Sequence, residues 1–339
     1  MKKRHISLKD LADELGISIS TVSRALKNNP IISPDLTKKI QELALTRNYI
    51  PNPLAMGLLR QQTKMIGVIV PDLVTHFYSS IISGIEEVAK EKGYYILIAS
   101  SYESMEKEIE SVNNLLKTRV EGLIVCISQE TSSFEHFDQL IQNEIPLVFF
   151  DRVPETLEVP SVTVDGAEAA KNITLHFYEN GCRRIGYISG PEHLNISKHR
   201  KNGYLQGLNE CGLKLNPELL VESNLNADDA TIATKKLLSL KQIPDAIFGI
   251  NDTIAFAAMK EIKKHMLRIP DDIALLGFTD EFHSTVVEPA LTSVTHPTLQ
   301  MGREAARLFF ESIEKGENFA EKVVLPTKLI IRESSVKQK

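Results

Sequence analysis

Polar residues that could bind a small molecule follow the buried, β-branched runs of this chain. In open sheets of parallel strands, ligands bind beyond the carboxyl ends of the strands, so the residues after each run are candidates. They carry carboxylate, amide, hydroxyl, guanidinium or aromatic groups, and they are Asp72, Phe77, Tyr78, Asp151, Arg152, Arg200, Asn251, Asp252 and Thr279. Together these groups predict a binding site for a small ligand.

The chemistry of this set suits a sugar or another small hydroxylated metabolite. Aromatic faces can cover an apolar ring face while carboxylate, amide and guanidinium groups bond to hydroxyls. A purine or a nucleoside would use much the same groups. Structural interpretations also stand beside this one: Asp72 and Asp252 can cap helices, Phe77 can belong to the core, and Asp151 can pair with Arg152.

Catalysis and metal binding find no support in the sequence. It has no GxSxG, GxGxxG or GxxxxGK(S/T) motif and no cluster of histidine, cysteine and carboxylate with metal-ligand spacing. Cys126, Cys182 and Cys211 are odd in number and far apart, which indicates neither a disulfide framework nor a zinc site. We therefore expect a chain that is no enzyme, uses no cofactor or metal, and works in a reducing cytoplasm.

The elements that position the candidate residues are predicted from residue 65 onward, where short β-branched runs alternate with longer amphipathic stretches. The first series comprises strands over 66–70, 95–99, 123–127 and 146–150 and helices over 80–92 and 107–118. The second comprises strands over 162–164, 184–188, 246–250 and 273–278 and helices over 168–179, 200–210 and 253–264. Two such series predict an α/β body of two similar lobes with parallel sheets, and a ligand cleft between them.

A different pattern occupies the first 50 residues. Ser7 can cap a first helix, Gly16 supplies a turn, and Ser18 can cap a second helix. Two helices joined by a tight glycine turn form a helix-turn-helix, although such helices also occur in ordinary helical bundles. A third helix is predicted from Ser33, with Pro34 at its first helical position.

The outward face of the second helix predicts DNA contacts. Ile19, Ser20 and Arg24 point away from the core and could contact base edges, since an arginine can donate two hydrogen bonds to guanine. Hydroxyls around this helix and at the helix starts could hold phosphates, and they belong to Ser7, Ser18, Thr21 and Ser23.

A short apolar segment follows Pro51. Asn52 can cap it, Pro53 can fill the first helical position, and it ends at Arg60. So short a helix cannot offset its nucleation cost in water, so neighbours must order it. Its leucines favour pairing with a second copy, or insertion of Leu58 between base steps of DNA, over exposure. Permanent packing on the body is the alternative.

These segments together resemble the lactose/galactose-repressor (LacI/GalR) family of bacterial transcription regulators. The resemblance rests on Ser7-Leu8-Lys9-Asp10-Leu11-Ala12, Gly16-Ile17-Ser18, Thr21-Val22-Ser23-Arg24-Ala25-Leu26 and Tyr49-x-Pro51-Asn52-x-x-Ala55-x-x-Leu58, and it continues through nearly all of the chain. It implies a recognition helix at 19–26 and a DNA-binding hinge helix that includes Asn52, Ala55 and Leu58, with Leu58 as the intercalating wedge.

For the body, the resemblance implies two periplasmic-binding-protein-like lobes with crossings near residues 159–164, 287–293 and 323–328. We expect a head over 1–50, a hinge and linker over 51–63, and a body over 64–339. The N-lobe would hold about 64–161 and 294–324, and the C-lobe about 162–293 and 325–339. Four residues depart from the family pattern. Thr279 stands where many members have aspartate, Leu194 and Ile196 stand in a loop where some members place polar ligand contacts, and Met56 stands where a basic residue is common.

Charge is distributed unevenly along the chain. Residues 1–64 hold 11 basic and 5 acidic side chains, a net +6, whereas the whole chain carries a net charge of −5. A basic head on an acidic body suits phosphate binding by the head, although a solvated charged face would give the same count.

We expect a ligand-responsive, sequence-specific DNA-binding regulator, most simply a cytoplasmic homodimeric repressor on a near-palindromic operator. Only residues 333–339 follow the last family-like strand, too few for a tetramerisation helix. A solute-binding protein with no DNA role is the rival, but it needs a secretion signal and no head. Charged residues interrupt the apolar stretch that a signal would need, and the apolar runs are strand-length, so no membrane partner is expected.

Overall fold

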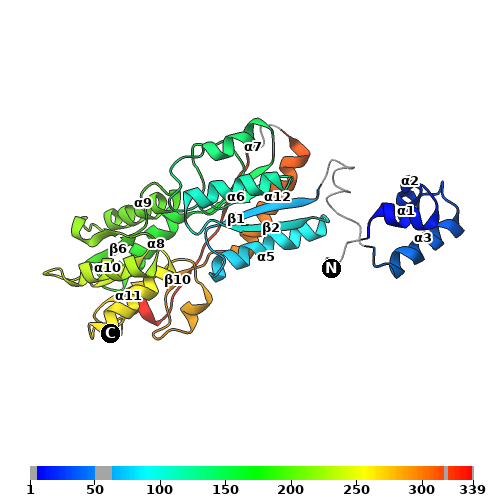
Figure 1. The fold of residues 1–339 in the computed structure, drawn as a ribbon. Helices are drawn as coiled ribbons and strands as arrows, with labels where there is room; N and C mark the ends of the chain where they lie inside the picture. The colour runs from blue at the N-terminus through cyan, green and yellow to red at the C-terminus, as the bar shows by residue number, and fades with distance from the viewer. Residues whose placement is uncertain (1–5, 50–62, 317–319, 338–339) are drawn as a thin grey trace. The chain divides into compact units, whose positions relative to one another are not determined.

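The computed structural model describes residues 6–49, 63–316 and 320–337 (Figure 1). The chain divides into two compact units, residues 1–63 and 64–339, here called the head and the body. Of the residues expected to contact DNA, Asn52, Ala55 and Leu58 lie outside the described residues.

Three helices form the described part of the head: α1 (Leu8–Leu15), α2 (Ile19–Leu26) and α3 (Pro34–Thr46). Their inner faces meet in a small core of Leu11, Ala12, Val22, Ala25, Ile40 and Ala44. Gly16 ends α1 in the left-handed region with a φ of 64°, a conformation that glycine adopts without steric cost. The predicted helix-turn-helix is confirmed.

Side chains cap two of these three helices. Ser7 and Asp10 form a capping box, in which the Ser7 N–H donates to Asp10 Oδ2 at 2.8 Å and the Asp10 N–H donates to Ser7 Oγ at 3.3 Å. Ser18 Oγ accepts a backbone N–H of α2 at 3.1 Å. Ser33 occupies the cap position of α3 but makes no side-chain hydrogen bond there, so the proline that follows it sets the first turn.

The first sheet of the body has six strands in the order β11-β5-β4-β3-β1-β2. All its neighbouring pairs are parallel. The strands are β1 (Met65–Val70), β2 (Tyr95–Ser100), β3 (Leu123–Val125), β4 (Leu147–Phe150), β5 (Ser161–Val164) and β11 (Lys322–Leu325). This sheet and the helices that cover it form the N-lobe.

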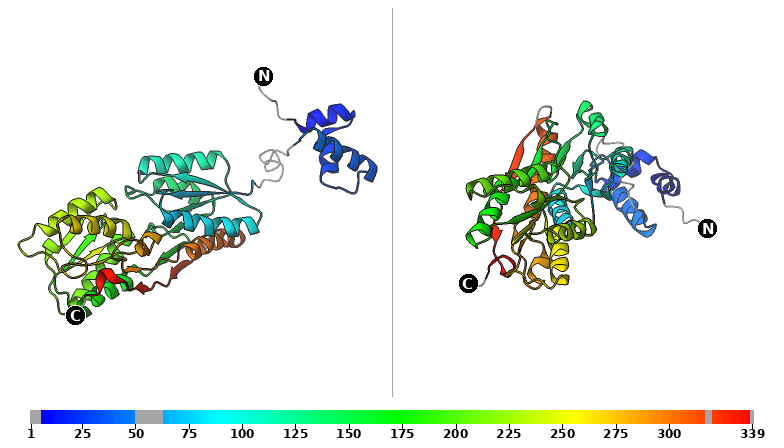
Figure 2. Two further views of the ribbon diagram at one scale, coloured as in Figure 1. Left: turned by 90° about the horizontal axis from the view of Figure 1, so that it is seen from below. Right: turned by 90° about the vertical axis from the view of Figure 1, so that its left-hand side faces the viewer.

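Helices cover both faces of this sheet. Residues of β1 alternate between the faces, so Ile66, Val68 and Val70 join one core cluster and Ile69 joins the other. The helices α5 (His76–Glu91) and α12 (Thr298–Lys315) lie side by side on the first face, and α6 lies on the opposite face (Figure 2). The second face is covered by α6 (Met105–Lys117), η1 (Glu135–Phe137) and α7 (Asp138–Gln142).

Two glycines let α5 and α12 approach closely. A Cβ atom on Gly84 would lie 2.2 Å from the carbonyl oxygen of Leu299, and one on Gly302 would lie 2.0 Å from the carbonyl oxygen of Ile81. Because both neighbours are backbone atoms, any larger residue would force the helices apart.

The second sheet has four parallel strands in the order β7-β6-β8-β9. They are β6 (Ile185–Ser189), β7 (Leu220–Glu222), β8 (Ala246–Gly249) and β9 (Ala274–Leu276). Its helices pack in pairs, α8 (Gly166–Glu179) with α9 (Asn195–Glu210) and α10 (Ala227–Leu238) with α11 (Asp252–Lys264). With the short helices η2 (Pro217–Leu219), η3 (Phe282–Thr285) and η4 (Glu333–Ser335), they form the C-lobe.

The chain passes between the lobes at three places (Figure 1). It leaves the N-lobe after β5, returns through β10 (Ser293–Val294) into α12, and leaves again after β11 through β12 (Leu329–Ile330). The strands β10 and β12 pair antiparallel, so two of the passages are hydrogen-bonded to each other. These passages lie close to the segments that the family resemblance implies.

Several elements differ from the sequence predictions. The strand at 162–164 is predicted to open the second series, but β5 pairs with β4 and β11 and belongs to the first sheet. The helix α5 begins at His76 rather than at 80, and α9 at Asn195 rather than at 200. Neither start has a side-chain cap hydrogen bond, so the local signal for a helix start is missing.

The sequence pattern also leaves out α7, α10, α12 and β7. The short elements α7 and β7 carry little periodicity of their own. The helix α12 differs, because its 18 residues bury one face and the sequence does carry a helical pattern there. None of the helices in the described part of the chain is long and apolar enough to span a membrane.

Candidate functional site

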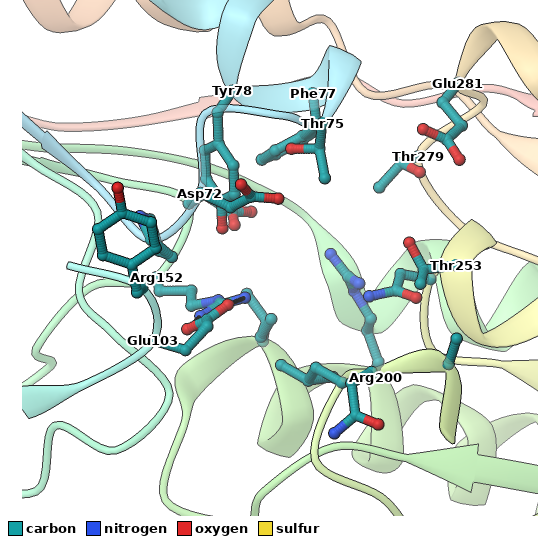
Figure 3. A pocket seen from close by; sticks show the side chains of 18 residues that line it. Asp72, Thr75, Phe77, Tyr78, Glu103, Arg152, Arg200, Thr253, Thr279 and Glu281 are labelled. Atoms are coloured by element: carbon teal, nitrogen blue, oxygen red, sulfur yellow. Dashed lines mark hydrogen bonds and ion pairs between the residues drawn. The ribbon is translucent and has the colours of Figure 1, made fainter. Parts of the chain in front are cut away.

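A cavity of about 440 Å³, here called the cleft, opens between the lobes at the carboxyl ends of their strands (Figure 3). The N-lobe lines it with Pro71, Asp72, Thr75, Phe77, Tyr78, Tyr102, Glu103, Asp151 and Arg152. The C-lobe lines it with Ile196, Arg200, Leu225, Asn226, Ala227, Asn251, Thr253, Thr279 and Glu281. The cleft therefore lies where parallel sheets usually bind ligands.

All the predicted ligand residues except Asp252 line this cleft. Asp252 is fully buried, and one of its oxygens accepts the Ser293 hydroxyl at 2.6 Å. Its other oxygen accepts the Ser284 hydroxyl and the Glu281 N–H, both at 2.9 Å. Asp252 therefore fastens β10 and the loop after β9. It does not cap α11, because the cap is Asn251, whose Oδ1 accepts the Ile254 N–H at 2.9 Å.

The aromatic wall of the cleft comes from α5, not from a turn before it. Phe77 and Tyr78 both point from α5 toward the cleft (Figure 3). Their rings meet edge to face with centroids 5.0 Å apart, and Phe77 meets the ring of His296 at 4.9 Å. Tyr78 is buried, which raises the pKa of its hydroxyl well above the ordinary value and keeps it a neutral hydrogen-bonding group.

Arg152 is held by a bidentate ion pair. Its Nη1 and Nη2 donate to the two carboxylate oxygens of Glu103, at 2.6 and 3.0 Å. Glu103 Oε2 also accepts the Gln129 N–H at 2.8 Å. This geometry fixes the plane of the guanidinium, while Arg152 Nε is buried and has no hydrogen-bond partner among the described residues.

Arg200 reaches the cleft from the interior of α9, one turn after its start, not from the first position of a helix (Figure 3). Its Nη1 donates to the carbonyl oxygen of Ile250 at 2.6 Å, and its guanidinium lies 3.7 Å from the ring centroid of Phe278. Burial lowers the pKa of Arg200 from its ordinary value. Its Nε is buried and has no hydrogen-bond partner among the described residues.

Asp151 lines the cleft, and the buried His296 lies next to it. Asp151 has a φ of 57°, and its Oδ1 lies 3.6 Å from His296 Nε2, too far for a hydrogen bond. Burial and the nearby Arg200 lower the pKa of His296 to about 3, so this imidazole is neutral. Burial raises the pKa of Asp151, while Arg200 and Arg152 oppose that shift. The carboxyl group of Asp151 therefore lies beside a neutral histidine and is influenced by two positively charged arginines.

Sequence reasoning missed several residues of the cleft. Tyr102 and Glu103 follow β2, so the rule that identifies Asp72 could also have found them. Asn226 follows β7, a strand without a clear sequence pattern. Thr253 and Glu281 lie only a few residues beyond Asn251 and Thr279, and the chain bends back to the cleft there.

The head presents the predicted DNA-contacting face. Ile19, Ser20 and Arg24 on α2 are exposed, whereas Thr21 and Ser23 on its flanks are half-buried. Ser7 and Ser18 are exposed at the starts of α1 and α2, and Ser18 Oγ lies 2.8 Å from the hydroxyls of both Ser20 and Thr21. Arg24 makes no ion pair with the described residues, so its guanidinium is available.

Among the described residues, no group of three or more histidine, cysteine, aspartate or glutamate side chains is placed to hold a metal ion.

Comparison with known proteins places these two units in one family. A profile described as "Bacterial regulatory proteins, lacI family" matches residues 7–52, and one described as "Periplasmic binding protein-like domain" matches residues 174–335. Catabolite control protein A of Priestia megaterium is 32% identical over 98% of this chain and 99% of its own length. The chain belongs to the lacI family of bacterial regulatory proteins.

Other known proteins are similar to both the head and the body of this lacI-family protein. The HTH-type transcriptional repressor CytR of Escherichia coli K12 is 30% identical over 97% of this chain and 96% of its own length. A solved structure of the transcriptional regulator CelR in complex with cellobiose is 26% identical, with a TM-score of 0.74, and covers 97% of this chain and 100% of its own. The α/β fold with a helix-turn-helix head and a periplasmic-binding-protein-like body is therefore confirmed.

Proposed function

We propose that this lacI-family protein is a repressor that binds a specific operator through its head and is controlled by a small hydroxylated metabolite, most simply a sugar, bound in the cleft. The observation that carries the proposal is that both lobes line one cavity with polar and aromatic side chains, among them Arg152 from the N-lobe and Arg200 from the C-lobe. A ligand in this cavity contacts both lobes, so it binds most tightly when they are closed on it.

The exposed face of α2 supports DNA recognition by the head. Ile19, Ser20 and Arg24 are the residues we assign to base edges. The hydroxyls of Ser7, Ser18, Thr21 and Ser23, together with the starts of α1 and α2, are assigned to phosphates. Asn52, Ala55 and Leu58 remain predicted hinge contacts.

The cleft supports a sugar-like effector. Phe77 offers an aromatic face and Tyr78 a neutral hydroxyl, while Asp72, Asn251 and Thr279 offer groups that can bond to hydroxyls. The relatives include a repressor by name and a regulator solved with cellobiose, which agree with such a role.

Two copies acting together would match a near-palindromic operator, because a two-fold dimer presents two α2 helices in related orientations. We propose a cytoplasmic homodimer in which ligand binding in the body changes the spacing of the two heads through the 51–63 segment. No catalytic role is assigned to any residue.

The test is a binding experiment on the full-length protein. DNA selected from a randomised library would be measured by fluorescence anisotropy, alone and with cellobiose, ribose or adenosine added. We expect a near-palindromic sequence to bind roughly a thousandfold more tightly than unrelated duplex, and one compound to change that affinity. Equal affinity for all duplexes would refute the proposal that the protein is an operator-specific repressor.

A further inference from the structure

The cleft carries an excess of negative charge that its arginines do not balance. Its lining includes four carboxylates, from Asp72, Glu103, Asp151 and Glu281, but the guanidinium groups of only two arginines, Arg152 and Arg200. The positions of these six side chains decide which ligands can enter.

The two arginines act mainly on two of the carboxylates, those of Glu103 and Asp151. Glu103 forms the bidentate pair with Arg152, at 2.6 and 3.0 Å. Asp151 also lines the cleft; burial raises its pKa, and the charges of Arg200 and Arg152 oppose that shift. The charge of Arg152 is therefore matched by Glu103, and Arg200 lies under the influence of Asp151.

The other two carboxylates lie on different walls. Asp72 follows β1 in the N-lobe, accepts the Val74 N–H at 2.9 Å, and makes no ion pair with the described residues. Glu281 follows β9 in the C-lobe, and the imidazole of His283 is 3.9 Å from its Oε1, beyond hydrogen-bond distance. Figure 3 shows Asp72 near the aromatic wall and Glu281 beyond Thr279. A ligand between the lobes meets an acceptor on each side.

The arginines still offer hydrogen bonds even though their charge is compensated. Both residues line the cleft, and a guanidinium carries more N–H donors than the two that Arg152 gives to Glu103 or the one that Arg200 gives to Ile250. A hydroxyl group can accept from such a donor and at the same time donate to a carboxylate. A phosphate or carboxylate group can accept but cannot donate in its charged form, and it would be repelled by the carboxylates.

We propose that Asp72 and Glu281 act as a charge filter, so that the cleft takes an uncharged polyhydroxylated compound and rejects its phosphorylated and carboxylated derivatives. This inference rests on the proposed effector role of the cleft. It implies that the protein responds to a compound before a kinase or an oxidising enzyme has made it anionic.

The experiment compares matched probes on the full-length protein by thermal shift and calorimetry. The pairs are glucose with glucose 6-phosphate, ribose with ribose 5-phosphate, and adenosine with its 5′-monophosphate, with gluconate as a carboxylated probe. In the wild type we expect the neutral member of a binding pair to bind at least about tenfold more tightly than the anion. In the double variant Asp72→Asn/Glu281→Gln we expect this ratio to fall to within about threefold, because both substitutions keep the shape and remove the charge.

The double variant Glu218→Gln/Glu314→Gln is the control. It removes two exposed carboxylates outside the cleft and changes the net charge of the chain by the same amount. We expect it to keep the wild-type ratio. Tighter binding of the phosphate by the wild type, or an unchanged ratio in Asp72→Asn/Glu281→Gln, overturns the charge filter. Operator affinity measured without any probe separately tests the proposal that the protein is a repressor. The repressor proposal and the charge filter can therefore fail independently.

Discussion

The side-chain amide of Asn195 bonds to the backbone on both sides of Arg152. Asn195 Nδ2 donates to the carbonyl oxygen of Asp151 at 3.0 Å, and Asn195 Oδ1 accepts the Val153 N–H at 3.0 Å. Asn195 begins α9 in the C-lobe, whereas Asp151 to Val153 follow β4 in the N-lobe. One buried residue thus joins the two lobes directly behind the cleft.

Replacement of Asn195 by alanine should loosen this contact. The Val153 N–H would lose its partner while partly buried, at a cost of about 1 to 3 kcal/mol in the free energy of unfolding. Effector affinity should fall as well, because Arg152 loses its fixed backbone. Urea unfolding and calorimetry measure both effects. Asn209→Ala, at an exposed position of the same helix, is the control, and equal behaviour of the two variants would contradict a role for the contact.

Arg200→Lys should abolish the response to effector while leaving operator affinity without effector nearly unchanged. Lysine keeps a positive charge but loses Nε and the planar group that stacks on Phe278. Operator binding titrated with the effector shows the result. Arg268→Lys, at a surface ion pair with Asp272, should respond as the wild type does. An unchanged effector affinity in Arg200→Lys would remove this residue from the binding site.

Arg24→Ala should weaken binding to the best operator by roughly 1 to 3 kcal/mol and relax the preference at one base position. Lys27 lies at the end of α2, and any loss of affinity in Lys27→Ala should be equal for all DNA sequences. Selection from a randomised DNA library, repeated with each variant, separates the two patterns. A uniform loss for Arg24→Ala would make it a phosphate contact.

His296 should make the body less stable in acid. Its pKa is lowered from 6.5 to about 3, so the native protein binds fewer protons than the unfolded chain in this range. The stability that this produces is fully present above pH 6.5 and decreases as the pH falls toward about 3, by about 1.4 kcal/mol per pH unit. His296→Gln should flatten the dependence of unfolding free energy on pH between about 7 and 5. His199→Gln, exposed and paired with Glu155, serves for comparison, and an equal slope in wild type and His296→Gln would contradict the prediction.

Many residues of the cleft could be predicted from the sequence. They follow strands, and the apolar runs that form those strands are strong local signals. Asp72 and Asp151 were found in this way, and so was the head, since the caps and the glycine turn are local as well. The failures share a different cause. The two hydroxyl partners of Asp252, Ser284 and Ser293, lie more than 30 residues away. Nothing near Asp252 in the chain therefore distinguishes a buried structural residue from a ligand contact.

The placement of β5 failed for a related reason. Four residues form it, and its two neighbours are β4 and β11, the second of which lies more than 150 residues later. A strand this short takes its sheet from its partners rather than from its own pattern. The position of Arg200 within its helix was also missed for lack of a local signal. Its helix begins at Asn195, and no side-chain hydrogen bond caps that start.

The pairing of β5 with β11 has a consequence for the order in which the nascent protein matures on the ribosome. Residues 6–49 hold all the described contacts of the head core, so that unit can fold once the first part of the chain has emerged. The six-stranded sheet begins at residue 65 but gains its edge strand only when residues 322–325 leave the exit tunnel. During synthesis, a folded head can therefore precede a complete cleft, and a ribosome that stops early releases a chain with its DNA-contacting face but without its finished sensor.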